Sequence, residues 1–209
     1  MHLLLTDRLT CPRCGPRFGL ILLARSVVDR RVLEGTLGCP NCRDGFDVRG
    51  GFGDLRAPPR DALPAGRAGD PGPAAPEDVE RLAALLGVAE GPGTLALVGK
   101  PSRMAAGLAE LVSGVEVAAV DADLARWPES PGVSRLVARP GLPFFDQTLR
   151  GAAVDGDLGS PWIREACRAV SRLARVVVTS APEGAGALLE ESGLRILAAE
   201  AGTIVAARG

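Results

Sequence analysis

Residues 76–209 alternate between apolar runs with helical spacing and apolar runs with the length of strands. A helix is predicted to begin at Pro76, since apolar residues from Val79 to Leu86 recur on one face and Gly87 follows as a stop signal. Further helices are predicted over residues 104–112, 162–173 and 186–192, and strands over residues 94–98, 115–120, 135–138, 151–154, 175–179, 194–198 and 203–207.

This alternation predicts an α/β fold with a Rossmann-like, mostly parallel sheet that helices cover on both faces. Only residues 199–202 separate the last two predicted strands. Because four residues are too few for a crossover, these strands are expected to form a C-terminal antiparallel hairpin.

The first 56 residues follow a different pattern. Short apolar runs such as Leu20–Leu23 and Val32–Leu33 alternate with turn residues, which predicts a small β module. Residues 57–75 are rich in proline, glycine and alanine, a composition typical of a linker without regular structure. We therefore expect a β module over residues 1–56, a linker over 57–75 and a Rossmann-like domain over 76–209.

The β module contains four of the five cysteines, arranged as two C-x-x-C turns, Cys11 to Cys14 and Cys39 to Cys42. Two such turns can present four thiolates to one ion, and the softness of sulfur and a tetrahedral geometry favour zinc at Zn–S distances of about 2.3 Å. With all four ligands from protein, the site is expected to be structural. The alternatives are a pair of disulfides, a redox C-x-x-C motif or an iron cluster.

Composition narrows the function classes. The net charge is −1 and aromatic residues make up 3% of the chain, so neither a basic nucleic-acid platform nor a stacking surface is predicted. No run of about 18 uncharged apolar residues occurs, and residues 1–8 are too short and too soon acidic for a secretory signal. We expect a cytoplasmic protein that does not enter the membrane.

Three segments around the cysteine turns resemble a known family. They are Leu9–Cys14, Glu34–Cys42 and Phe46–Leu55, and together they resemble the zinc-ribbon family of methyltransferase-activating subunits and its short bacterial relatives. The resemblance covers nearly all of residues 3–56 and implies a partner module rather than a catalyst. It also implies that the ribbon docks on the Rossmann-like domain.

Residues 78–208 resemble a class I S-adenosylmethionine-dependent methyltransferase. The resemblance rests on the order of four features: Thr94–Gly99, Asp121 after the second strand, Leu142–Phe144 before Gly151–Asp155, and Leu188–Leu194 before the closing hairpin. It implies Gly99 and Asp121 as cofactor-binding residues. Asp155 belongs to the same predicted set, because it occupies the position at which such methyltransferases have a catalytic or substrate residue.

The predicted cofactor loop departs from that family's pattern. Gly99 is the one glycine left where three are expected, Pro101 lacks an amide donor, and Arg103 adds bulk. For Lys100 and Arg103 two interpretations are open: their side chains contact an anion, or they belong to a loop that faces solvent.

Two functions follow from these patterns. The first is a zinc-binding, methyltransferase-like protein with a degenerate cofactor loop, a non-catalytic binding or scaffold unit for another protein or for RNA. The second is an active small methyltransferase that uses S-adenosylmethionine and has its zinc-ribbon activator fused in cis.

Overall fold

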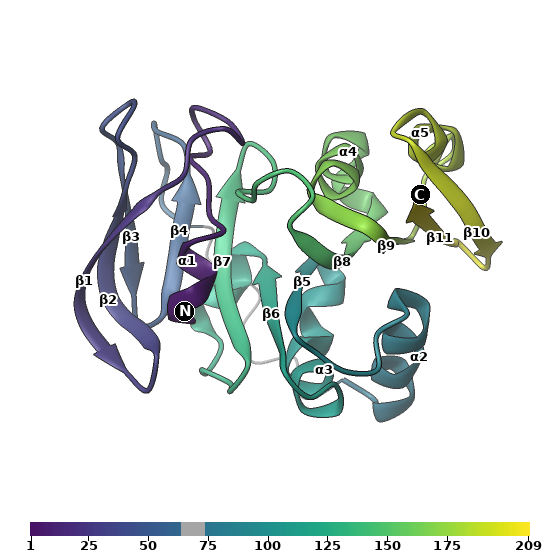
Figure 1. Cartoon of the computed structure of the whole chain (residues 1–209), viewed down its shortest axis with the longest axis horizontal. Coiled ribbons are helices and arrows are strands. Elements are labelled where there is room, and N and C mark those ends of the chain that lie inside the picture. The colour runs from purple at the N-terminus through teal and green to yellow at the C-terminus, as the bar shows by residue number, and fades with distance from the viewer. Residues whose placement is uncertain (64–73) are drawn as a thin grey trace.

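In the computed structural model, which describes residues 1–63 and 74–209, eleven strands form one continuous sheet (Figure 1). The strands are β1 (Ile21–Val28), β2 (Arg31–Gly38), β3 (Gly45–Arg49), β4 (Phe52–Arg56), β5 (Gly93–Val98), β6 (Val115–Val120), β7 (Val133–Arg139), β8 (Leu149–Asp155), β9 (Val170–Thr179), β10 (Leu194–Glu200) and β11 (Thr203–Arg208). Their order across the sheet is β1-β2-β3-β4-β7-β6-β5-β8-β9-β11-β10.

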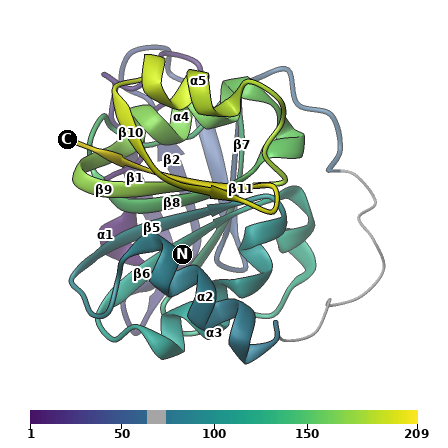
Figure 2. The ribbon, with the colours of Figure 1, turned by 90° about the vertical axis from the view of Figure 1, so that its right-hand side faces the viewer.

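Helices cover this sheet on both faces (Figure 2). The α-helices are α1 (Leu3–Thr6), α2 (Pro76–Leu86), α3 (Ala105–Leu111), α4 (Ser160–Ala169) and α5 (Ala185–Glu191), and the 3-10 helices are η1 (Lys100–Met104), η2 (Ala122–Arg126) and η3 (Gly156–Leu158). The helices α2 and α3 pack on one face, and α4 and α5 pack on the other. Of the helices in the described residues, none is both long and apolar enough to cross a membrane.

The predicted fold class is confirmed. The strands β5 to β9 pair in parallel, whereas β11 pairs antiparallel with both β9 and β10. The strand order reverses between β5 and β8, which are parallel neighbours although β6 and β7 lie between them in the chain. In an open α/β sheet, ligands bind at the carboxyl ends of strands beside such a reversal.

The four N-terminal strands extend the same sheet. They form an antiparallel meander whose last strand, β4, pairs in parallel with β7, from Phe52 beside Arg135 to Arg56 beside Arg139. Segments 1–56 and 76–209, expected as separate domains, therefore contribute strands to one sheet. Their folding as separate units stays a prediction.

The core has one layer on each face of the sheet. Leu5 and Phe46 of the N-terminal segment share a buried cluster with Val154 on β8 and Leu189 on α5. On the other face, apolar side chains of α2 and α3 cover β5 and β6. The helix α2 begins at Pro76 and ends at Gly87, whose φ of 68° is the left-handed conformation that commonly closes a helix.

The prediction for residues 162–173 is wrong at its C-terminal end. The helix α4 ends at Ala169, and Val170 begins the ten-residue strand β9. The β-branched Val170 pairs with Leu149 on β8, and Leu173 adopts φ +64° with its side chain 84% exposed. Tertiary pairing therefore overrides the local helical spacing.

The predicted linker is described only in part. Residues 57–63, 74 and 75 belong to no helix or strand. Residues 64–73 of that prediction lie outside the described residues.

Candidate metal centre and cofactor site

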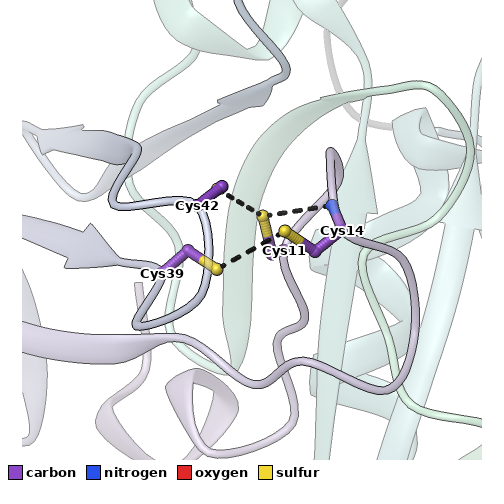
Figure 3. A group of neighbouring side chains, drawn as sticks. All are labelled: Cys11, Cys14, Cys39 and Cys42. Atoms are coloured by element: carbon purple, nitrogen blue, oxygen red, sulfur yellow. Dashed lines mark hydrogen bonds between the residues drawn. The ribbon is translucent and has the colours of Figure 1, made fainter.

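Four cysteines converge from two loops (Figure 3). Cys11 and Cys14 lie between α1 and β1, and Cys39 and Cys42 lie in the turn between β2 and β3. The Sγ atoms of Cys11 and Cys42 are 3.6 Å apart, those of Cys39 and Cys14 are 3.8 Å apart, and all four lie within 4.8 Å of one another.

These distances fit a tetrahedral metal ion. Four sulfurs at about 2.3 Å from one ion would be about 3.8 Å apart at the corners of a regular tetrahedron. The structure therefore brings together all four predicted ligands, and the cluster could hold a metal.

The two cysteine turns share one backbone geometry. The amide of Gly15 donates to the carbonyl oxygen of Cys11 at 2.9 Å, and the amide of Arg43 donates to that of Cys39 at the same distance. Gly15 has φ +88° and Arg43 has φ +65°, so the residue after the second cysteine is left-handed in both turns. This repeated turn directs both sulfurs of each pair toward the opposite pair.

The cluster lies partly inside the core. Cys11 and Cys39 are buried, and burial raises the pKa of the Cys11 thiol. Burial opposes ionisation of Cys39 as well, but hydrogen bonds from the amides of Cys42 and Asn41 lower its pKa to about 7. The side-chain amide of Asn41 also donates to Sγ of Cys14 at 3.2 Å. These donors stabilise negative charge on sulfur.

The predicted cofactor residues lie at the carboxyl ends of β5, β6 and β8. Gly99 follows β5 with φ +71°, and its amide donates to the carbonyl oxygen of Val120 at 3.0 Å. A methyl group added at Gly99 would lie 2.9 Å from Cβ of Asp155 and 2.9 Å from Cδ1 of Leu158. Glycine is therefore required here by both the backbone conformation and the close approach of β8.

The ammonium group of Lys100 lies beside the same aspartate, Asp155. Lys100 forms ion pairs with Asp157 and, at 3.6 Å between Nζ and Oδ2, with Asp155. The Asp155 side chain is only 5% exposed, and its other oxygen accepts a hydrogen bond from the amide of Asp157 at 3.2 Å. The hydrogen bond to Asp157 and the charge of Asp155 raise the pKa of Lys100. The sequence interpretation did not include this pairing, although the Asp-x-Asp spacing after β8 was a signal for it.

Asp121 lies on the other side of Gly99 from Asp155, since β6 and β8 are the two neighbours of β5. It directly follows β6, and its Oδ1 accepts a hydrogen bond from the amide of Asp123 at 3.0 Å, which caps η2. The structure therefore places Gly99 between the ends of β6 and β8. Asp155 approaches it closely from β8, and Asp121 follows the β6 residue Val120, whose carbonyl oxygen accepts from the Gly99 amide.

Two cavities open beside this edge of the sheet. The larger, about 610 Å³, lies between α2, α3 and η2 over β6 and β7. The smaller, about 400 Å³, lies between α2, η1 and the ends of β9 and β11. Gly99, Asp121 and Asp155 line neither of these two cavities, whereas Arg103 lines both.

No protein-family model matches the sequence, and a search of curated proteins finds no match either. Among solved structures, the chain is similar to a geranyl diphosphate methyltransferase in complex with S-adenosylmethionine, with a TM-score of 0.51, 11% identity, and coverage of 64% of this chain and 85% of that one. It is also similar to a precorrin-6y C5,15-methyltransferase from Geobacter metallireducens, with a TM-score of 0.49, 13% identity, and coverage of 64% of this chain and 88% of that one. A third is an S-adenosylmethionine-dependent O-methyltransferase from Thermotoga maritima, with a TM-score of 0.46, 16% identity, and coverage of 65% of this chain and 66% of that one.

The similarity to the geranyl diphosphate methyltransferase shows the fold. The chain has the Rossmann-like fold of class I S-adenosylmethionine-dependent methyltransferases, together with a cluster of four cysteines near its N-terminus. At 11% identity, fold alone does not specify an activity.

Proposed function

We propose that this chain is a zinc-binding, methyltransferase-like protein that does not transfer methyl groups and acts as a binding or scaffold unit. The observation that carries the proposal is the ion pairing of Lys100 with Asp155 and Asp157. S-adenosylmethionine carries a positively charged sulfonium. Because the ammonium of Lys100 already pairs with both carboxylates and offsets one of their two negative charges, the site offers that cation less electrostatic stabilisation.

The backbone of the loop supports the same conclusion. The amide and the hydroxyl of Ser102 both donate to the carbonyl oxygen of Gly99. Both donors are therefore occupied within the turn and are not offered to a ligand. Pro101 is buried within η1 and has no N–H to offer. These residues do not fit S-adenosylmethionine.

We assign the four-cysteine cluster as a zinc site. The sulfur–sulfur distances of 3.6 and 3.8 Å support a tetrahedral S₄ site, and thiolate ligands in this geometry favour zinc. We further propose that β1 to β4 form a zinc ribbon of the methyltransferase-activating family that is fused in cis. The parallel pairing of β4 with β7 supports this, because it attaches the ribbon to the sheet it would stabilise.

The proposed partner is a protein rather than RNA. In the described sheet β1 is an edge strand, and three of its apolar side chains are largely exposed: Ile21 at 57%, Leu23 at 65% and Val28 at 52%. An open edge with apolar side chains can pair with an extended segment of another protein. The aromatic side chains on which RNA bases stack are scarce in this chain.

The alternative function is an active methyltransferase with its activator in cis. Asp121 favours it, because only Oδ1 of this carboxylate has a hydrogen-bond partner in the described residues. The other oxygen could accept a hydrogen bond from a ribose hydroxyl.

Thermal melting with S-adenosylmethionine tests the proposal. We expect no stabilisation of the unmodified chain by 1 mM cofactor, about 1,000 times the concentration that would half-saturate a micromolar site. In a triple variant, Pro101 and Arg103 are replaced with glycine and Lys100 with methionine. If the loop alone prevents binding, the cofactor should raise the melting temperature of this variant. A rise in the unmodified chain of similar size to that of the triple variant would contradict the proposal.

A further inference from the structure

We propose that the cavity of about 400 Å³ between α2 and η1 binds a small organic phosphate, a phosphate monoester with an apolar body. This inference deepens the proposed function and rests on it, since it gives a non-catalytic fold a ligand of its own. The cavity lies at the carboxyl edge of the sheet, where β9 ends and β11 begins. That edge is where open α/β sheets bind ligands.

Positive charge dominates the lining. Arg81 on α2, together with Lys100 and Arg103 on η1, faces one acidic side chain, Asp78. Lys100 is already paired with Asp155 and Asp157. Within the described residues, neither Arg81 nor Arg103 has a hydrogen-bond or ion-pair partner, so both guanidinium groups remain available for an anion.

Hydroxyl groups complete the polar side of the cavity. Ser180 and Thr203 line it from the ends of β9 and β11, and their hydroxyls have no partner among the described residues. Thr179 is the exception, because its hydroxyl donates to the carbonyl oxygen of Val154 at 3.4 Å. Two guanidinium forks and two free hydroxyls suit a group with three terminal oxygens, which a phosphate monoester presents and a carboxylate does not.

The rest of the lining is apolar. Leu82 and Leu85 on α2 and Pro101 and Met104 on η1 form this part of the cavity. The volume falls within the range of about 300–1,000 Å³ of small-molecule sites. A phosphate with an aromatic or aliphatic body would therefore place its charged end beside the arginines and its body against these side chains.

Titration of the full-length, zinc-loaded chain with phenyl phosphate tests the inference. We expect saturable binding with a Kd below about 1 mM, and affinity for phenol, the uncharged counterpart, at least about tenfold weaker. In a ¹H–¹⁵N spectrum the shifted amides should belong to residues 78–85, 100, 102–104, 180 and 203. Absence of saturation at about 10 mM, or shifts confined to other residues, would overturn the inference.

Charge-removing variants locate the site independently of the spectrum. Arg81→Gln and Arg103→Gln should each weaken phenyl phosphate binding by about tenfold or more, because each removes a charged donor. Arg195→Gln is the matched control, since Arg195 is exposed near the opposite end of the β10–β11 hairpin from Thr203. Equal losses in the control and in Arg103→Gln would contradict a site at this cavity.

A parallel titration with S-adenosylmethionine separates this inference from the proposed function. Cofactor binding that is lost on Asp121→Ala would contradict the non-catalytic function. Failure of phenyl phosphate to bind would contradict only the phosphate site.

Discussion

Arg135 on β7 donates a 2.7 Å hydrogen bond from Nη2 to the carbonyl oxygen of Gly50, in the turn between β3 and β4. Its Nη1 donates to the carbonyl oxygens of Leu124, at 3.2 Å, and Trp127. Only 5% of Arg135 is exposed, and burial lowers the pKa of its guanidinium. One buried side chain therefore connects the N-terminal strands to η2 through three main-chain acceptors.

Replacing Arg135 with methionine should destabilise the chain by about 2–4 kcal/mol, because the substitution leaves buried carbonyl groups without donors. Urea unfolding at pH 7 measures this change. Arg139→Met is the control, since Arg139 is exposed at the end of the same strand and its loss should cost less than about 0.5 kcal/mol. Equal losses in both variants would contradict the role of Arg135.

Zinc removal should destabilise the whole sheet rather than the cysteine loops alone. Cys11 and Cys39 belong to the same buried cluster as Val154 on β8, so loosening the loops exposes a shared core. We expect one zinc per chain by elemental analysis, none in Cys39→Ser, and a fall in melting temperature of more than about 10 °C. Cys167→Ser should keep its zinc. Iron, or no metal, in the unmodified protein would contradict the assignment.

Gly99→Ala should destabilise the chain by about 1–3 kcal/mol, because φ is +71° and the new methyl group would lie 2.9 Å from Cβ of Asp155. Gly186→Ala is the control. No atom lies within 4 Å of the methyl position at Gly186, and alanine favours the helix α5 by about 0.5–1 kcal/mol. Chemical denaturation of both variants compares them, and equal stability would show that the turn after β5 tolerates a side chain.

Burial raises the pKa of the Cys167 thiol from 9.0 to about 11. The folded state therefore keeps its proton at a pH where the unfolded chain loses it. The resulting stabilisation is present below pH 9.0 and is lost as the pH rises toward about 11. Unfolding free energies measured between pH 8 and 11 should fall less steeply in Cys167→Ser, and identical slopes would contradict the shift.

Much of the fold could be predicted from the sequence because its signals are local. The continuous apolar strand at 94–98, the helix that Gly87 closes and the two C-x-x-C turns each depend on residues close together in the chain. The helix end at residue 173 was wrong because Val170 pairs with Leu149, a contact that helical spacing does not indicate.

The candidate site was predicted only in part for the same reason. The positions of Gly99, Asp121 and Asp155 follow from strand ends, which local patterns locate. Lys100 and Asp157 are 57 residues apart, and the parallel register of β5 with β8 brings them together. The pairing of β4 with β7 also depends on register, which the apolar pattern of either strand alone does not specify.

Calorimetric titration of S-adenosylmethionine into the zinc-loaded, unmodified chain distinguishes a non-catalytic binding protein from an active methyltransferase. We expect no binding tighter than about 1 mM, because Lys100 already pairs with the carboxylates at the end of β8 and the donors of Ser102 are used within the turn after Gly99. Asp121→Ala should then leave the titration unchanged. Micromolar binding by the unmodified chain that is lost on Asp121→Ala would contradict the non-catalytic function and favour an active methyltransferase.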